Sequence, residues 1–216
     1  MSESNREVRG VHPENFGWYE IKLSTQEMDY LWKCIDNRKE SHKDRLAGMI
    51  HESNVLVDED DWFWENTLQP LVCKYASQMG NVGGNVPVNQ YHPYYLSSMW
   101  VNYQKQTEFN PLHDHNGVYS FVIWMKIPTR HFEQNKNPIA LRSNHPKLST
   151  FEFRYLNTLG QIKEFIYEMN PEMEGMMLLF PSKLMHQVNP FYNCDEDRIS
   201  ISGNITLDTR EVFNQT

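Results

Sequence analysis

The sequence predicts a mainly β protein, a double-stranded β-helix (jelly roll) with an N-terminal helical layer. From Tyr94 onward the pattern changes to a period of two, which is typical of strands. Before that point, two segments carry the apolar spacing of helices. Short strands separated by turns, after a helical layer, indicate a jelly roll with helices packed on one sheet. We expect the strands near residues 96–104, 111–115, 118–127, 150–156, 162–168, 176–181, 186–189 and 198–207.

The first helix is predicted at residues 25–37. Ser24 and Glu27 form a capping-box pattern, and apolar residues then follow at helical spacing, from Met28 to Ile35. Upstream of this helix, residues 16–23 could form a short edge strand.

A second helical region follows the acidic run 58–61 and continues to Met79. Negative charges suit the N-terminus of a helix, so we interpret the run as a solvated helix start and not as a metal site. Pro70 lies within this helix and should kink it, since proline lacks the N–H group that the helix needs.

The remaining long segment, residues 129–149, shows no clear periodicity, and a loop of this length is typical of lids and binding loops as well as of disordered segments. We expect residues 1–216 to form a single domain, in which residues 1–90 are a mainly helical N-terminal support and residues 91–207 are the jelly-roll core.

Composition excludes several classes of protein. The formal net charge of −8, without a long basic run, argues against a nucleic-acid partner. No segment has the eighteen consecutive apolar residues of a membrane span, and the N-terminus has no apolar run of a signal peptide. Cys34, Cys73 and Cys194 are far apart, which predicts reduced thiols and a cytoplasmic location.

The chemistry of the chain centres on residues 100–128, where His113, Asp114 and His115 follow one another between two predicted strands. Side chains two apart on a strand leave the same face, so His113 and His115 can converge on one point while Asp114 points away. The best candidate for a third ligand is His186, which follows an apolar strand and a turn.

After His186 comes a strand that alternates and directs Arg198, Ser200 and Ser202 to one face. A guanidinium presents a planar, bidentate fork to a carboxylate. For Arg198 alone, a surface ion pair with Asp195 or Glu196 would be the default. Together with the three histidines, Arg198 and Ser200 indicate a metal site with an anion pocket beside it.

These residues resemble the 2-oxoglutarate/Fe(II)-dependent oxygenases, and more narrowly the small phage-type members found in marine phage genomes, with a closing motif like that of prolyl hydroxylases. The family pattern is His-x-Asp, a distal His, and an Arg-x-Ser about ten residues further on. His113, His186, Arg198 and Ser200 match it. The resemblance runs from about Trp100 to Leu207 and also includes two short segments before it, residues 42–48 and 60–63.

The resemblance implies an enzyme, a dioxygenase that hydroxylates a C–H bond of a peptidyl or small-molecule substrate and releases succinate and CO₂ from 2-oxoglutarate. Fe(II) would be held by His113, His115 and His186, and the distal carboxylate of 2-oxoglutarate by Arg198 and Ser200. Tyr103 matches the position of a tyrosine that hydrogen-bonds this cosubstrate in related prolyl hydroxylases. The location would be cytoplasmic, in the host cell if the protein is phage-encoded, with no membrane or nucleic-acid partner.

The main departure from the family pattern is His115, which stands where a carboxylate ligand is usual. Asp114 could be the ligand if a bulge rotates the strand, and Glu108 could approach from the preceding turn. Period-two geometry favours His115.

Three other functions stay open at the level of sequence. The first is a three-histidine cupin dioxygenase without a 2-oxo acid, in which Arg198 would bind the substrate's own carboxylate. The second is a non-enzymatic jelly-roll module with a structural metal or none. The third is a nucleobase-modifying oxygenase, which the negative net charge disfavours. A peptide or protein substrate, basic or flexible, would suit the negative net charge.

Overall fold

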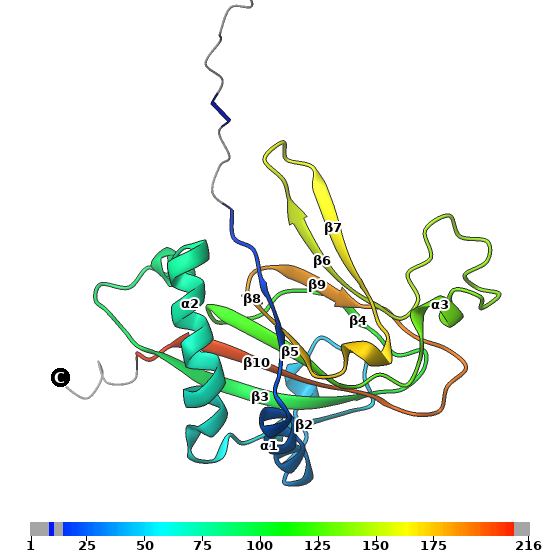
Figure 1. Ribbon diagram of the computed structural model, residues 1–216, viewed down its shortest axis with the longest axis horizontal. Coiled ribbons are helices and arrows are strands. Elements are labelled where there is room, and N and C mark those ends of the chain that lie inside the picture. The colour runs from blue at the N-terminus through cyan, green and yellow to red at the C-terminus, as the bar shows by residue number, and fades with distance from the viewer. Residues whose placement is uncertain (1–8, 11–14, 210–216) are drawn as a thin grey trace, which may run out of the picture.

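Two β-sheets face each other in the computed structural model, which describes residues 9–10 and 15–209 (Figure 1). The larger sheet has the strand order β1-β8-β5-β10-β3-β2, and the smaller sheet has the order β4-β9-β6-β7. The larger sheet comprises β1 (Tyr19–Lys22), β2 (Glu52–Leu56), β3 (Tyr94–Gln104), β5 (Tyr119–Lys126), β8 (Met176–Pro181) and β10 (Arg198–Leu207). The smaller comprises β4 (Asn110–His113), β6 (Thr150–Leu156), β7 (Ile162–Glu168) and β9 (Met185–Val188).

The chain crosses between the two sheets in the order of a double-stranded β-helix. From β3 to β6, successive strands lie alternately in the larger and the smaller sheet. The β6–β7 hairpin stays in the smaller sheet, and the alternation then resumes from β8 to β10. Neighbouring strands pair antiparallel throughout both sheets. The predicted fold class is therefore confirmed, and all eight predicted strands are present with ends shifted by two residues or fewer.

Two edge strands come from the N-terminal part of the chain. β1, predicted as an edge strand, pairs with β8. β2 was not predicted, because its sequence Glu-Ser-Asn-Val-Leu does not alternate, and it pairs with β3 at the opposite edge. The first 90 residues therefore supply strands to the larger sheet as well as helices.

The helix α1 (Thr25–Asp36) begins as predicted. The Ser24 side chain accepts a hydrogen bond from the Glu27 N–H at 3.3 Å, and the Glu27 carboxylate accepts one from the Ser24 N–H at 2.7 Å. This capping box satisfies two donors that a helix start otherwise leaves unpaired, which contributes about 1 kcal/mol.

The second helical region also begins at the acidic run. The Asp58 carboxylate accepts hydrogen bonds from the N–H groups of Phe63 and Trp64, each at 2.8 Å. A π-helical turn, η3 (Trp64–Leu68), precedes α2 (Gln69–Met79). Pro70 lies in the first turn of α2, directly after this widened turn, where its missing N–H group is tolerated.

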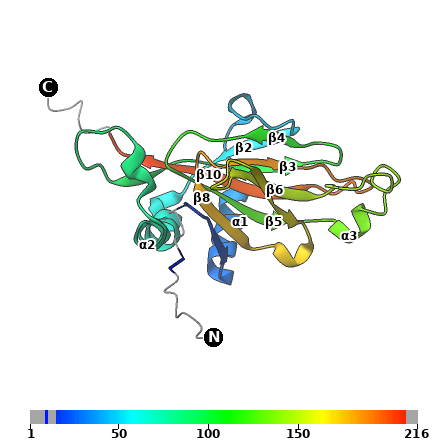
Figure 2. The same ribbon diagram turned by 90° about the horizontal axis from the view of Figure 1, so that it is seen from above.

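Helices α1 and α2 cover one side of the larger sheet (Figure 2). Leu31, Tyr75 and Tyr119 are fully buried in the core between helices and sheet. A second cluster lies between the two sheets and includes Trp124 and Phe153. Burying each large apolar side chain stabilises the fold by about 1.5–3 kcal/mol.

Shorter helical segments occur in the connections. They are η1 (Lys43–Arg45), η2 (Glu59–Asp61), η4 (Val82–Asn85), η5 (Pro171–Met173) and the four-residue α3 (His131–Gln134). The loop 129–149 is thus partly helical, and Lys147 fixes its end through an ion pair of 2.8 Å with the fully buried Glu152. None of the helices in the described part of the chain has the length and apolar character of a membrane span.

Candidate metal and cosubstrate site

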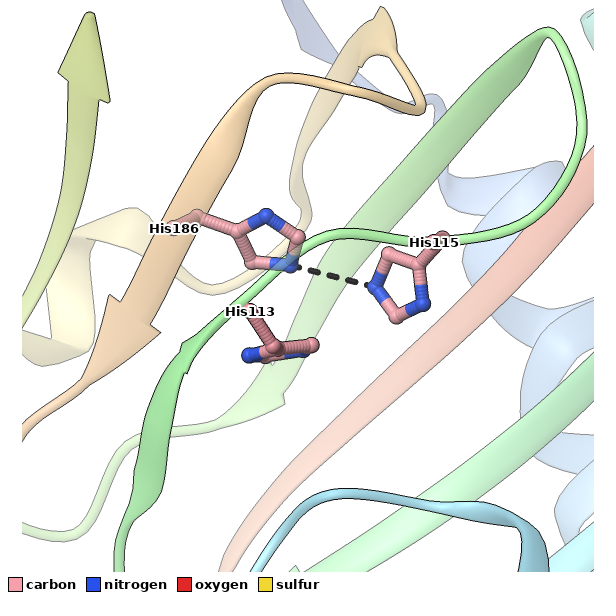
Figure 3. A group of neighbouring side chains, drawn as sticks. All are labelled: His113, His115 and His186. Atoms are coloured by element: carbon pink, nitrogen blue, oxygen red, sulfur yellow. Dashed lines mark hydrogen bonds between the residues drawn. The ribbon is translucent and has the colours of Figure 1, made fainter.

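Three histidine side chains converge between the two sheets (Figure 3). His113 ends β4, and His186 lies directly opposite it on β9. One nitrogen of each ring, including that of His115, lies within 4.8 Å of the other two. The Nε2 atoms of His115 and His186 are 3.1 Å apart. The three histidines that the sequence predicted as metal ligands are therefore neighbours in space.

His115 reaches the cluster from a loop and not from a strand, which corrects the predicted strand 111–115. The His115 N–H donates to the Ser182 carbonyl at 2.9 Å, so the turn after β8 holds the loop in place. Gly117 follows with a φ of +115°, and a Cβ there would lie 2.9 Å from the Ile205 carbonyl oxygen. Glycine allows the chain to bend at this point and enter β5.

Hydrogen bonds prepare two of the imidazoles for a metal. Nδ1 of His113 lies 2.7 Å from the Pro111 carbonyl, and Nδ1 of His186 lies 2.9 Å from the Leu184 carbonyl. A carbonyl can only accept, so each Nδ1 carries the proton and each Nε2 of the neutral ring keeps its lone pair.

Burial favours the neutral rings that a metal requires. It lowers the pKa of His115 to about 4, and it lowers the pKa of His186 as well. The neighbouring imidazoles act in the same direction. At neutral pH these lone pairs are available, and the donor set fits Fe(II), which imidazole nitrogens commonly bind.

The two carboxylates considered as substitutes lie elsewhere. Asp114 is 42% exposed and its carboxylate is 3.4 Å from the ammonium of Lys183. Glu108 accepts a hydrogen bond from the Lys105 N–H at 2.8 Å and lies 3.2 Å from Nδ1 of His51. Within the described part of the chain, the cluster of possible ligands contains the three histidines and no carboxylate.

A cavity of about 440 Å³ surrounds the histidines and extends to Arg198. Ser200 and Ser202 line it too, as the alternation along β10 predicted. Sequence reasoning missed other lining residues, among them Trp100, Asn102 and Gln104 on the neighbouring strand β3. Their spacing of two was the available signal, but nothing in the sequence indicated which face of β3 turns inward.

Arg198 is 2% exposed and has no carboxylate partner within the described residues. Its guanidinium donates to the Gln104 Oε1 atom at 3.1 Å and to the Asn189 carbonyl at 2.8 Å. The Phe191 ring lies 5.0 Å from its central carbon. Three acidic residues precede Arg198. Glu196 pairs with Lys126 at 2.7 Å, and Asp195 accepts a hydrogen bond from Gln106 at 2.8 Å. Asp197 forms no ion pair with Arg198, and its Oδ1 atom is buried without a hydrogen-bond partner within the described residues.

An unpaired buried guanidinium is costly, and desolvation lowers the pKa of Arg198 to about 9. An incoming carboxylate would relieve this cost by supplying the missing counter-charge. The cavity therefore combines a metal-binding cluster with a preformed anion pocket.

Tyr103 is not brought to this cavity, and the prediction for it is corrected. On β3, Asn102 and Gln104 face the cavity, so the alternation of the strand turns Tyr103 to the other side of the sheet. There its ring lies 5.5 Å from the guanidinium carbon of Arg38.

The fold and the site together define a jelly-roll metalloprotein with an anion pocket. A family model described as "Putative 2OG-Fe(II) oxygenase" matches residues 98–204, which contain all three histidines and Arg198. The chain belongs to this family, and it is an Fe(II)- and 2-oxoglutarate-dependent oxygenase. A search of curated proteins finds no significant match.

Several solved structures are similar in fold. A Pseudomonas putida prolyl-4-hydroxylase is 12% identical, with a TM-score of 0.49, and the alignment covers 89% of this chain and 93% of the hydroxylase chain. The viral collagen prolyl hydroxylase of Paramecium Bursaria Chlorella virus-1, in complex with 2-oxoglutarate, is 12% identical with coverages of 87% and 94% and a TM-score of 0.49. A Trichoplax adhaerens prolyl hydroxylase with a hypoxia inducible factor peptide is 13% identical, with coverages of 93% and 87% and a TM-score of 0.49.

Proposed function

We propose that His113, His115 and His186 hold Fe(II), and that Arg198 with Ser200 binds the distal carboxylate of 2-oxoglutarate. The observation that carries this proposal is the buried Arg198, which shares one cavity with the three histidines and has no carboxylate partner among the residues that the structure describes. A bidentate guanidinium beside a hydroxyl suits a carboxylate ligand.

The proposed reaction is hydroxylation of a C–H bond of a peptidyl or small-molecule substrate, with release of succinate and CO₂. The bound Fe(II) and 2-oxoglutarate supply the oxidising chemistry. The protein supplies position and shelter: Arg198 fixes one end of the cosubstrate, while Trp124 and Phe151 contribute apolar walls to the cavity. Its volume of about 440 Å³ is in the range of small-molecule sites and supports a substrate group beside the cosubstrate.

We also propose that residues 1–216 form one domain, in which residues 91–207 are the oxygenase core. The pairing of β1 with β8 and of β2 with β3 supports this, since both N-terminal strands extend the larger sheet. The phage-type origin and the cytoplasmic location stay predictions from the sequence.

Calorimetric titration of 2-oxoglutarate into anaerobic, Fe(II)-loaded protein tests the proposal. We expect micromolar binding that Arg198→Ala weakens by about 100-fold, because the variant loses a charge-assisted, bidentate contact. Arg198→Lys should restore part of the affinity. Lys126→Ala serves as the control, since Lys126 pairs with Glu196 and does not line the cavity.

An unchanged affinity in Arg198→Ala would reject Arg198 as the carboxylate anchor. An absence of 2-oxoglutarate binding to the iron-loaded wild type would favour instead a three-histidine dioxygenase without a 2-oxo acid.

A further inference from the structure

One wall of the cavity is formed by residues 42–48, which we call the lip. One end of the lip is hydrogen-bonded to β2, where the His42 N–H donates to the Ser53 carbonyl at 2.7 Å. At its other end the Met49 N–H donates to the Phe109 carbonyl at 2.9 Å, just before β4. Since β2 belongs to the larger sheet and β4 to the smaller, the lip crosses from one sheet to the other beside the cavity.

The lip is packed closely at its far end. A Cβ at Gly48 would lie 1.9 Å from the Oδ1 atom of Asn110, which is the first residue of β4. A larger residue at position 48 would therefore require the Asn110 side chain to move.

Aromatic contacts connect the lip with the metal cluster. The His42 ring lies 5.3 Å from the Trp100 ring, with 30° between their planes. Trp100 in turn lies 5.8 Å from the ring of His115. A substrate that enters next to His115 is thus close to the lip.

The charged groups that line the cavity are Arg45, Asp114 and Arg198, apart from the histidines. Asp114 forms an ion pair with Lys183, and in the proposed function Arg198 binds the cosubstrate. Arg45 is exposed and forms no ion pair with any residue that the structure describes. Its positive charge acts on His42, whose pKa is lowered first by burial and then by Arg45.

The charge balance of the loaded cavity is positive. Three neutral imidazoles add no negative charge, and Fe(II) cancels doubly ionised 2-oxoglutarate. The positive charges of the Arg45 and Arg198 guanidinium groups then remain uncompensated in the cavity, although the formal net charge of the whole chain is −8. Charges close to the cavity act on an incoming anion more strongly than the distant charges of the chain, because salt screens interactions beyond about 10 Å.

We propose that the substrate of this oxygenase carries an oxyanion, a carboxylate or a phosphate, and that Arg45 on the lip binds it. The proposal rests on the proposed function of the same cavity, and it replaces the basic peptide that the net charge alone would favour. Arg45 is then a specificity-determining residue, since it contacts the substrate and not the cosubstrate.

Protection of Arg45 from phenylglyoxal tests this binding directly. The protein is held anaerobic with Fe(II) and saturating 2-oxoglutarate, so that Arg198 is occupied, and modification is followed by peptide mass spectrometry. The probes are N-acetyl-L-leucine, its amide, and inorganic phosphate. We expect the carboxylate probe to slow modification of Arg45 about threefold or more and the amide to have no effect. Arg38, which lies outside the cavity, is the internal control.

The phosphate arm separates the two sources of the oxyanion. Slowing by both phosphate and the carboxylate probe indicates a site for either group, and slowing by one alone identifies the group that the substrate carries. Equal rates with all three probes would overturn the proposal while leaving the cosubstrate site intact. A wild type that binds no 2-oxoglutarate would instead refute the proposed function itself.

A second measurement uses succinate formation with a library of carboxylates, phosphates and their neutral amides. For any compound that stimulates turnover, Arg45→Gln should raise KM about tenfold with little change in kcat, and Arg45→Lys should recover most of the loss. Lys43→Gln is the matched control, because Lys43 is a neighbouring cation that does not line the cavity. Stimulation by neutral compounds that is insensitive to Arg45→Gln would contradict the assignment.

Discussion

At the scale of single residues, the three histidines are held in two different ways. His113 and His186 are each fixed by a carbonyl two residues earlier in the chain, which sets the tautomer of the ring. Within the described part of the chain no such bond orients Nδ1 of His115, whose position depends on the backbone bond to Ser182 and on packing against Trp100. His115 is also the residue at which the site departs from the usual carboxylate ligand.

His115→Ala should therefore remove most of the metal affinity. Losing one of three ligands weakens Fe(II) binding by about 100-fold or more, whereas Asp114→Ala should have little effect because its carboxylate faces Lys183. Calorimetry or Co(II) absorption measures both variants. Strong loss in Asp114→Ala with retention in His115→Ala would restore the carboxylate ligand and refute the three-histidine site.

The pH dependence of the metal-free protein follows from the same burial. His115 titrates at about 4 when folded and near 6.5 when unfolded, so between these values the unfolded chain binds more protons. The free energy of unfolding should thus be highest above pH 6.5 and fall toward pH 4, by about 1 kcal/mol per pH unit. His186 contributes in the same direction.

Urea denaturation in the presence of a chelator, at pH 7.5, 6 and 5, measures this slope. The His115→Gln variant should show a shallower decline, since glutamine does not titrate. Parallel declines in the two proteins would mean that His115 is not the group responsible.

At the scale of elements, the lip at residues 42–48 depends on one close approach. Gly48→Ala should destabilise the protein by about 1–3 kcal/mol, because its Cβ would collide with Asn110. The Asn110→Ala change should relieve the collision at little cost, since the Oδ1 atom of Asn110 is buried without a hydrogen-bond partner.

Thermal and urea unfolding of the single and double variants form a cycle that isolates this contact. Gly84→Ala is the matched control, because a Cβ there meets the Asn81 side chain at an ordinary 3.4 Å. Additive losses in the double variant would show that Gly48 does not press against Asn110.

At the scale of the whole molecule, bound Fe(II) and 2-oxoglutarate would connect the two sheets, because the side chains proposed to bind them come from both. His113 and His186 lie on the smaller sheet, and Arg198 and Ser200 lie on the larger. At a hundred times its Kd, 2-oxoglutarate should raise the free energy of unfolding of the Fe(II)-loaded protein by about 3 kcal/mol. This increment adds to the one that the metal gives by itself.

Thermal unfolding with metal, with metal and cosubstrate, and after chelation measures these increments. Arg198→Ala should keep the metal increment and lose the increment from 2-oxoglutarate. Retention of both increments in this variant would place the cosubstrate elsewhere.

The sequence by itself determined the order and nature of the elements. Period-two patterns predicted the eight core strands, and the capping box and the Asp58 carboxylate marked both helix starts. These signals are local, since alternation and capping depend on neighbours along the chain. The His-x-His spacing and the later His186, Arg198 and Ser200 likewise identified the residues that the fold brings to one cavity.

Only the tertiary structure decided which residues complete the site. Tyr103 and Asn102 are equally plausible in sequence, but the side of β3 that faces inward is set by pairing with β10 and β2. The strand β2 was not predicted, because the sequence of β2 does not alternate. Its extended conformation is stabilised by the hydrogen bonds of its pairing with β3. The candidate role of Arg45 likewise depends on tertiary structure. Its position on the wall of the cavity follows from the loop that connects the two sheets.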